Sequence, residues 1–290
     1  MQQTRNFSRI ISGTMTWGSW GNQLSKKEMS ELMHHCIACG LTTFDHADIY
    51  GSYSTEGDFG AAFAESGIQR EDIQLISKCG IQMTRGRDNA INHYQYDKEY
   101  IIWSVERSLK NLGTDYLDLL LLHRPSPLME PYEIAEAIEQ LKKSGKIKQF
   151  GVSNFTPSQI AMLEKAIPVS ANQVEFSLTH DAPMYDGTFD DCIYNNRMAM
   201  AWSPLGTFFR EKDTRTKRIK KAMEPLMEKY GVDESQLLLA WLMKHPATIF
   251  PVIGTTNKKR IEQSAKAAKI ALELQDWFAL LVASQGHDVP

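Results

Sequence analysis

The sequence predicts an α/β protein with a parallel (β/α)8 TIM barrel and two extra flanking helices. Short apolar runs alternate with helical patterns eight times over 290 residues, which indicates parallel strands joined by helices. The rival fold, an open doubly wound sheet, usually carries a Gly-x-Gly-x-x-Gly turn, and this chain has none. Without a linker or low-complexity segment, residues 1–290 are expected to form a single domain. The expected strands are 9–13, 42–45, 73–78, 117–123, 147–152, 171–174, 199–202 and 249–254.

Helical patterns separate the expected strands, and some begin with clear start signals. Thr156 followed by Pro157 places a capping residue before a proline at the first helical position, and Glu130 before Pro131 does so less well. The eight helices are expected to begin near residues 25, 55, 97, 131, 156, 187, 216 and 257. Two further amphipathic segments, 233–244 and 275–284, exceed the eightfold repeat and are expected to pack against the barrel wall.

Composition and charge are those of an ordinary globular enzyme. Hydrophobic residues make up 42% and charged residues 23%, and 32 basic against 35 acidic side chains give a net charge of -3. This balance gives no indication of nucleic acid or an anionic membrane as a partner. Residues 1–6 lack the apolar core of a signal peptide, and no run approaches the length of a membrane span. The expected location is therefore cytoplasmic.

Titratable side chains follow three of the expected strands. Asp45 ends the second strand, Lys78 the third and His123 the fourth, and Tyr50 follows shortly after Asp45. In a barrel, the C-terminal ends of the strands form the catalytic face. A phenol beside an ammonium group and a carboxylate is expected to release its proton more easily than in water. Each residue alone has a simpler structural explanation, but these four together, the catalytic four, indicate carbonyl reduction with hydride from a nicotinamide.

The order of further motifs makes the chain resemble the aldo-keto reductase family, in its bacterial type with a short C-terminal tail. Besides the catalytic four, the segments 151–155 (GVSNF), 172–175 (NQVE) and 202–206 (WSPLG) follow in family order. The resemblance covers nearly the whole chain and implies that Tyr50 donates the proton. It further implies that Asp45 holds Lys78 in place and that His123 orients the substrate oxygen.

The resemblance also implies a site for NADPH, with NADH possible but weaker. Ser153, Asn154 and Gln173 would bind the nicotinamide amide, and Trp202 would stack on its ring. Residues 255–260 contain three cations, two hydroxyls and no carboxylate, which suits the 2′-phosphate. A lysine common in the family is replaced by glycine at position 254, so only a moderate preference for NADPH is expected. The expected cofactor residues are Gly13, Thr14, Met15, Ser153, Asn154, Gln173, Trp202, Ser203, Leu205, Gly206, Gly254, Thr255, Thr256, Lys258 and Arg260.

Loops after the strands are expected to form the pocket for a small-molecule carbonyl substrate, because long βα loops usually determine specificity. Trp17 and Trp20 follow the first strand, Tyr94 lies in the loop 80–96, and Arg124 follows His123. The short C-terminal tail suggests an open pocket. The sequence leaves the oligomeric state, the physiological substrate and the direction of the reaction open.

Four cysteines occur, and two of them form a Cys-x-x-Cys pattern at Cys36 and Cys39. A zinc site would need a second pair, and a redox pair is the other functional alternative. Both cysteines lie on one face of a helical pattern that Gly40 ends, so buried free thiols and no metal are expected.

Two functions from different classes fit these observations. The first is an NADPH-dependent reductase of aldehydes or ketones. The alternative is an NADPH-binding regulatory module with little turnover, as some relatives of this fold hold NADPH within a channel or regulatory assembly. A hydrolase is disfavoured because the sequence has neither a metal cluster nor a nucleophile elbow. Turnover of a simple aldehyde with NADPH distinguishes the two.

Overall fold

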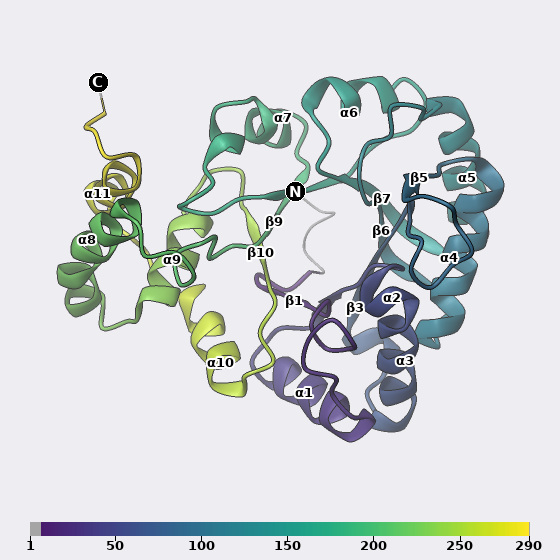
Figure 1. The fold of residues 1–290 in the computed structure, drawn as a ribbon, viewed down its shortest axis with the longest axis horizontal. Helices are drawn as coiled ribbons and strands as arrows, with labels where there is room; N and C mark the ends of the chain where they lie inside the picture. Colours follow the sequence, from purple (N-terminus) through teal and green to yellow (C-terminus); the bar gives the residue numbers. More distant parts are fainter. Residues whose placement is uncertain (1–6, 290) are drawn as a thin grey trace.

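The computed structural model describes residues 7–289 and contains a closed barrel of eight parallel strands (Figure 1). Around the barrel the strands follow the order β1-β10-β9-β8-β7-β6-β3-β2. Ile11 lies opposite Val252, so the first and last strands pair and close the barrel. The predicted TIM barrel is confirmed, and each expected strand is present. The barrel strands are β1 Ile11–Gly13, β2 Thr43–Asp45, β3 Gln74–Cys79, β6 Leu117–Leu122, β7 Ile147–Ser153, β8 Ala171–Glu175, β9 Met198–Trp202 and β10 Phe250–Ile253.

Helices follow the strands and cover the outside of the barrel. Their starts are stabilised by side-chain caps: Ser25 and Thr156 each form a capping box with the residue three positions later. The α-helices are α1 Lys26–Ala38, α2 Tyr50–Tyr53, α3 Thr55–Ser66, α4 Lys98–Leu112, α5 Pro131–Lys143, α6 Pro157–Leu163, α7 Thr188–Tyr194, α8 Thr214–Tyr230, α9 Glu234–Met243, α10 Lys258–Ala267 and α11 Leu274–Gln285. The short 3-10 helices are η1 Arg70–Asp72 and η2 Ala182–Met184.

Apolar side chains fill the inside of the barrel. Strand β6 is buried along its whole length, because Leu119 and Leu121 point inward while Leu120 and Leu122 pack against the helices. A strand buried on both faces reads as a continuous apolar run, which is why the sequence located it easily. Together with Ile11, Ile76, Met198, Met200 and Phe250, the two inward leucines form a closely packed floor beneath the catalytic face.

One of the two predicted extra helices is a different helix in the structure. Residues 236–242 of α9 are all buried, and α9 packs against β10 and α10, so it belongs to the barrel wall. Instead, α8 packs on α11, and the two lie together at the side of the molecule, beyond α9 (Figure 1). A helix over 233–244 packed against the barrel wall and a second helix over 275–284 are both confirmed, but the helix outside the eightfold repeat before β10 is α8 rather than α9. A helix that is apolar all round is buried, whereas α8 carries one apolar stripe and suits the periphery.

The loop 80–96, between β3 and α4, contains a small antiparallel hairpin that the sequence did not predict. Its strands are β4 Ile81–Gln82 and β5 His93–Tyr94. The base of the loop is fixed by Tyr96, whose hydroxyl donates to the carbonyl oxygen of Arg124 at 2.5 Å. Gly80 makes this packing possible, because its φ is +112° and a Cβ there would lie 2.0 Å from the Tyr96 ring.

Candidate active site

Three strand ends bring the catalytic four to one end of the barrel. Asp45 is the last residue of β2, Lys78 the penultimate residue of β3, and His123 follows β6 directly. Since the strands are parallel, these ends lie on the same face. Tyr50 reaches the same place from the loop after β2, and its ring centroid lies 6.2 Å from that of His123. The four residues are therefore neighbours, as the sequence predicted.

Lys78 joins Asp45 to Tyr50. Its Nζ lies 2.7 Å from Asp45 Oδ2 and 3.2 Å from Tyr50 Oη, and it donates to the carbonyl oxygen of His46 at 2.8 Å. The second oxygen of Asp45 accepts from Gln173 Nε2 at 3.0 Å. Lys78 is 1% exposed and Asp45 2%. A buried ion pair is stable only when its remaining donors and acceptors are also satisfied, and here all three hydrogens of the ammonium group have acceptors.

Burial and charge determine which of these groups carry protons. Burial raises the pKa of Tyr50, and the Lys78 ammonium only partly offsets it. The expectation of a more acidic phenol is thus wrong for this structure, because removal from water outweighs the attraction of one cation. Burial lowers the pKa of Lys78, but Asp45 and Tyr50 outweigh burial and the net shift is upward. At neutral pH the site therefore holds a protonated phenol beside an ammonium group.

His123 presents a neutral imidazole next to Tyr50. Burial, followed by the charges of Lys78 and Arg124, holds its pKa well below the ordinary value. Its Nδ1 is buried without a hydrogen-bond partner among residues 7–289. The backbone N–H of His123 donates to the carbonyl oxygen of Cys79 at 2.9 Å, which fixes the residue to β3. A neutral ring can donate one hydrogen bond to a substrate oxygen without adding a charge that competes with Lys78.

The polar residues at the C-terminal ends of β7, β8 and β9 are bonded to one another. Asn154 Nδ2 donates to Ser153 Oγ at 2.9 Å, and Trp202 Nε1 donates to Asn154 Oδ1 at 2.9 Å. Ser153 Oγ in turn donates to the carbonyl oxygen of Gln173, whose side chain bonds Asp45. Amide and hydroxyl groups of this kind suit a carboxamide ligand. The network places them directly beside the catalytic four.

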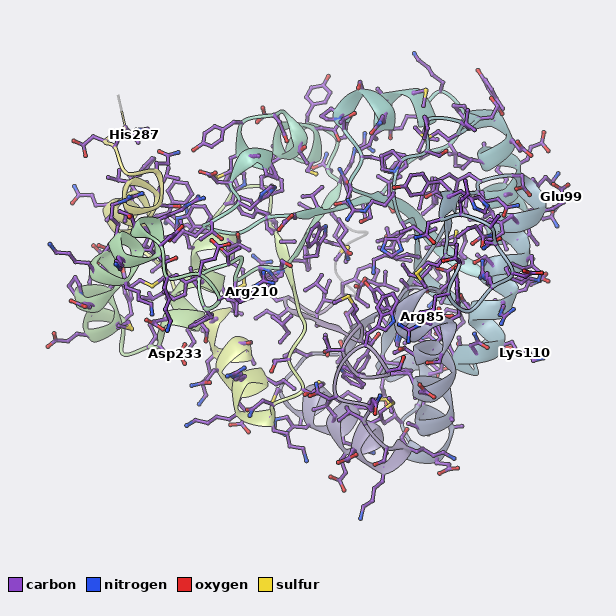
Figure 2. All side chains as sticks on the ribbon, viewed as in Figure 1. Arg85, Glu99, Lys110, Arg210, Asp233 and His287 are labelled. Atoms are coloured by element: carbon purple, nitrogen blue, oxygen red, sulfur yellow. The ribbon has the colours of Figure 1, made fainter. Side chains whose placement is uncertain are left out.

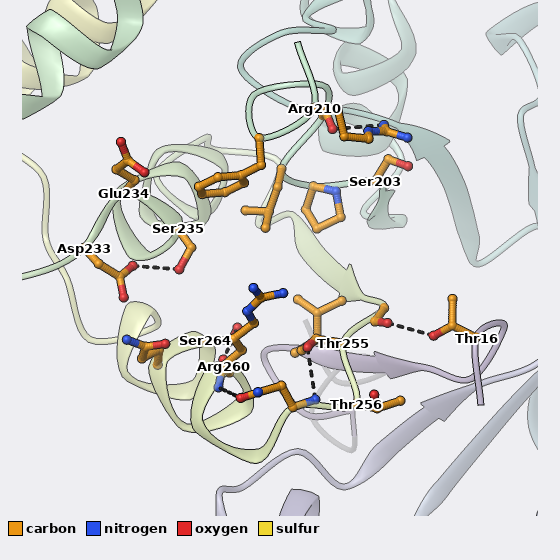
Figure 3. Close-up of a pocket in the computed structure, with 18 of the residues that line it drawn as sticks. Thr16, Ser203, Arg210, Asp233, Glu234, Ser235, Thr255, Thr256, Arg260 and Ser264 are labelled. Atoms are coloured by element: carbon orange, nitrogen blue, oxygen red, sulfur yellow. Dashed lines mark hydrogen bonds between the residues drawn. The ribbon is translucent and has the colours of Figure 1, made fainter. Parts of the chain in front are cut away.

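A cleft of about 1130 Å³ lies next to this network, bounded by the loops after β9 and β10 (Figure 3). Its size is at or above the upper end of ordinary ligand sites, so it can take an extended molecule such as a dinucleotide. Seven of the expected cofactor residues line it, namely Ser203, Leu205, Gly206, Gly254, Thr255, Thr256 and Arg260. Three other expected residues lie outside the cleft lining: Gly13 ends β1, and Thr14, which is buried, and Met15, which is exposed, follow it.

Two arginine side chains, Arg210 and Arg260, line the cleft. Arg260 points into it from α10, and its guanidinium makes no ion pair or side-chain hydrogen bond within the described part of the chain (Figure 3). Arg210, on the opposite wall, donates to the carbonyl oxygen of Gly206 at 3.1 Å. The start of α10, capped by Asn257, also faces this space. The unpaired guanidinium of Arg260 and a helix N-terminus are a donor set that fits phosphate.

One expected residue, Lys258, does not line the cleft, and other residues that the sequence analysis did not name do line it. Lys258 lies outside the lining, and its Nζ is 3.6 Å from Glu31. Asp233 and Glu234, at the start of α9, line the wall across from Arg260 (Figure 3). Asp233 caps α9 in a capping box, and this pattern in the sequence was the one available signal that a helix start lies there.

Comparisons with known proteins agree with this geometry. The model of the Aldo/keto reductase family matches residues 9–281. The chain belongs to the aldo/keto reductase family. It is 42% identical to "Uncharacterized oxidoreductase YcsN" of Bacillus subtilis, over 98% of this chain and 96% of that protein. It is 36% identical to a 6-dehydroglucose reductase of Agrobacterium fabrum, over 97% and 96% of the two chains. An aldo-keto reductase from Klebsiella pneumoniae, crystallised with NADPH, superposes with a TM-score of 0.79 at 26% identity, covering 98% of this chain and 92% of that one.

This membership makes the chain an NAD(P)H-dependent oxidoreductase that binds a nicotinamide cofactor and acts on small carbonyl compounds. The residues expected to touch its substrate separate into two groups. Trp20 is 37% exposed, and its ring lies 6.2 Å from that of Tyr50. Tyr94 is exposed on β5, and the guanidinium of Arg124 lies 5.8 Å from the Trp202 ring. Trp17, in contrast, is fully buried against Phe44 and Phe59, so the structure corrects its expected substrate role to one in the core.

The cysteines of the reductase are free, as expected. Cys36 is buried and Cys39 only partly so, and the Sγ of Cys36 contacts Ser12 Oγ at 3.8 Å. Burial raises the pKa of the Cys36 thiol to about 12, which keeps it protonated and unreactive. Within residues 7–289, no group of histidine, cysteine and acidic side chains could hold a metal ion. None of the helices described is both long and apolar enough to cross a bilayer.

Proposed function

We propose that this reductase converts aldehydes or ketones to alcohols with NADPH, and that Tyr50 donates the proton. The observation that carries the proposal is the position of Lys78 Nζ, 2.7 Å from Asp45 and 3.2 Å from the Tyr50 hydroxyl. This contact is the one a phenol needs in order to act as a general acid, because the ammonium group stabilises the phenolate that forms.

The residues divide the reaction among them. When bound, the reduced nicotinamide supplies the hydride that the carbonyl carbon accepts. Tyr50 transfers its hydroxyl proton to the carbonyl oxygen, and Lys78 offsets the resulting negative charge. His123, neutral and beside Tyr50, donates a hydrogen bond that orients the carbonyl oxygen. Asp45 keeps Lys78 in place through the buried ion pair.

For the cofactor, we propose that the amide network binds the nicotinamide and that the cleft holds the rest. Ser153, Asn154 and Gln173 would bond the carboxamide, and Trp202 would stack on the ring. Arg260 would bind the 2′-phosphate, which favours NADPH over NADH. The carboxylates of Asp233 and Glu234 on the facing wall oppose a second negative charge, which supports a moderate preference.

For the substrate, we propose a small polar aldehyde held by Trp20, Tyr94 and Arg124. Arg124 stands beside His123, and its guanidinium makes no ion pair within the part of the chain that the structure describes. Such a group can donate several hydrogen bonds to hydroxyls or an anion. Two relatives named 6-dehydroglucose reductase make polyhydroxylated aldehydes the first compounds to test.

The test is NADPH consumption with a panel of aldehydes by Tyr50→Phe and the parent protein. Removing the hydroxyl keeps the ring, and general acid catalysis contributes about 10²–10⁴-fold, so kcat should fall by that order. The dissociation constant for NADPH should stay within twofold. Activity within threefold of the parent would contradict the assignment of Tyr50. Tight NADPH binding by a parent protein that reduces none of the aldehydes would favour the regulatory alternative.

A further inference from the structure

The chain directly after Tyr50 is held in an unusual conformation. Gly51, Ser52 and Tyr53 have φ angles of 61°, 57° and 72°, so three successive residues are left-handed. Glycine adopts this region readily, but a residue with a side chain is strained there by about 1–3 kcal/mol. Two consecutive strained residues persist only when their surroundings hold them. Since the turn begins at Tyr50, whatever holds it also determines where the phenol points.

The loop 80–96 supplies the contacts that hold this turn. The backbone N–H of Met83 donates to the Tyr53 hydroxyl at 2.9 Å, and that hydroxyl donates to the carbonyl oxygen of Ile81 at 3.4 Å. Gly86 packs so closely that a Cβ there would lie 2.8 Å from the carbonyl oxygen of Ser52 and 3.0 Å from the Tyr53 ring. The loop 80–96 thus packs closely against the turn and is hydrogen-bonded to it.

Arg87 lies at the centre of the contact between the loop 80–96 and the left-handed turn. Its guanidinium carbon lies 3.9 Å from the centroid of the Tyr53 ring and 4.9 Å from that of Trp103, so the group is enclosed between two aromatic rings. Its Nη1 donates to Gln82 Oε1 at 2.5 Å, within the loop itself. The side chain is only 13% exposed, so it cannot serve as an anchor for substrate at the mouth.

Arg87 also reaches the chain on the other side of Tyr50. Its Nη2 lies 3.7 Å from Asp48 Oδ2, and this oxygen accepts further hydrogen bonds from Tyr100 and Ser104 at 3.2 Å each. The backbone N–H of Asp48 donates to the carbonyl oxygen of Lys78 at 3.0 Å. One guanidinium therefore joins the residue two positions before Tyr50 to the residue three positions after it.

We propose that Arg87 is a positioning residue for Tyr50: by bridging Asp48 and Tyr53 it fixes the left-handed turn that aims the phenol at the carbonyl oxygen. This inference rests on the proposed role of Tyr50 as proton donor. It does not make Arg87 a catalytic residue, because the guanidinium is enclosed between the rings of Tyr53 and Trp103 and makes no hydrogen bond or ion pair with any of the catalytic four. Its loss should therefore affect the chemical step more than the binding of NADPH.

The test compares Arg87→Ala with Arg85→Ala, a matched control on the same loop. Arg85 is exposed and makes no hydrogen bond or ion pair within the described residues. Arg87→Ala should lower kcat at least tenfold with the NADPH dissociation constant within twofold, and Arg85→Ala should change kcat less than twofold. Guanidinium ion added at millimolar concentration should enter the space between Tyr53 and Trp103 and restore kcat severalfold. A kcat within threefold of the parent, or a loss that guanidinium does not restore, would overturn the proposal.

Hydrogen exchange tests the proposed role of Arg87 independently of the proposed reductase activity. The amides of Tyr53 and Ser54 bond the carbonyl oxygens of Ile49 and Tyr50, at 3.3 and 3.2 Å. Arg87→Ala should speed their exchange at least tenfold without affecting α9, whether or not an aldehyde is reduced. Tyr53→Phe, which keeps the ring and removes the hydroxyl, should give a smaller change in the same direction. Unchanged exchange in Arg87→Ala would sink the proposal even if the reductase activity were established.

Discussion

The catalytic end of the site and the cofactor cleft are built in opposite ways. At the catalytic end, Lys78 is buried and every hydrogen of its ammonium group has an acceptor. In the cleft, Arg260 is exposed and its guanidinium has no ion-pair partner among the described residues. The two parts also lie in different regions of the molecule. In Figure 2, Arg85 lies on the loop beside the catalytic end, and Arg210 lies on the wall of the cleft opposite Arg260. Both parts depend on cations. Lys78 has all its hydrogen-bond partners in the free protein, whereas Arg260 has no ion-pair partner among the described residues.

This difference fits the roles proposed for the two cations. A group that stabilises charge in a reaction must be held in position beforehand, because reorganisation during the reaction would cost rate. A group that binds a phosphate is better left unpaired, because a partner acid would have to be displaced first. Removing Lys78 should therefore lower the stability of the free protein, whereas removing Arg260 should weaken the binding of a ligand.

Lys78→Met is expected to produce the largest effect on stability. It leaves Asp45 buried with only the Gln173 hydrogen bond, and breaking a buried pair costs about 3–5 kcal/mol. Denaturant unfolding of the protein without cofactor measures this loss directly. As a control, the double change with Asp45→Asn removes the uncompensated charge and should recover part of the stability. A loss below 1 kcal/mol for the single variant would mean that the pair is not the structural unit described above.

Arg260→Ala should give the next largest effect, and on binding rather than stability. Hydrogen bonds to charged groups contribute about 1.5–3 kcal/mol, so NADPH affinity should fall roughly tenfold to a hundredfold. NADH affinity and the free energy of unfolding should barely change. Lys258→Ala is the matched control, since its ammonium faces Glu31 instead of the cleft. Fluorescence titration decides, and equal weakening of NADPH and NADH would refute the assignment to the 2′-phosphate.

A smaller effect should appear in the dependence of stability on pH. Burial, then the charge of Glu56, raises the pKa of Asp48 to about 7, against the opposing effect of Arg87. The folded state thus binds more protons than the unfolded state between about pH 4 and 7, so this contribution to stability falls as pH rises through that range. Asp48→Asn should gain stability relative to the parent from pH 5 to 7.5. Exposed Asp88→Asn should not, and parallel curves for parent and Asp48→Asn would contradict this.

Much of the fold was predictable because burial is encoded locally. The run that forms β6 is apolar on both faces, and a strand inside a barrel needs that pattern. The hairpin of β4 and β5 has no such pattern, since β5 is exposed. The hairpin is held instead by hydrogen bonds of Ile81 and Met83 to the hydroxyl of Tyr53. The roles of α8 and α9 were exchanged for a related reason: periodicity reports that a helix is apolar, but not which neighbour covers it.

The site was predictable to the extent that strand ends determine it. The ends of β2, β3 and β6 placed Asp45, Lys78 and His123 correctly, because parallel strands share one catalytic face. The direction of the Tyr50 pKa was missed, since burial depends on the packed structure. Trp17 and Trp20 look alike in the sequence, but only the fold shows that one is in the core and the other near Tyr50. Arg87 contacts the rings of Tyr53 and Trp103, which come from distant segments of the chain. The sequence around Arg87 therefore contains no pattern that would indicate its role.

Closure of the barrel by β1 and β10 also affects how the chain is made. Strand β1 ends at Gly13 and β10 begins at Phe250. At about 5–20 residues per second, β1 waits on the order of 10–50 s on the ribosome before its partner is synthesised. During that time the nascent sheet has an open edge, and the apolar lining of its inner face lacks the side chain of Phe250. The same pairing that seals the finished enzyme therefore leaves an unpaired strand edge on the growing chain until the last strand is synthesised.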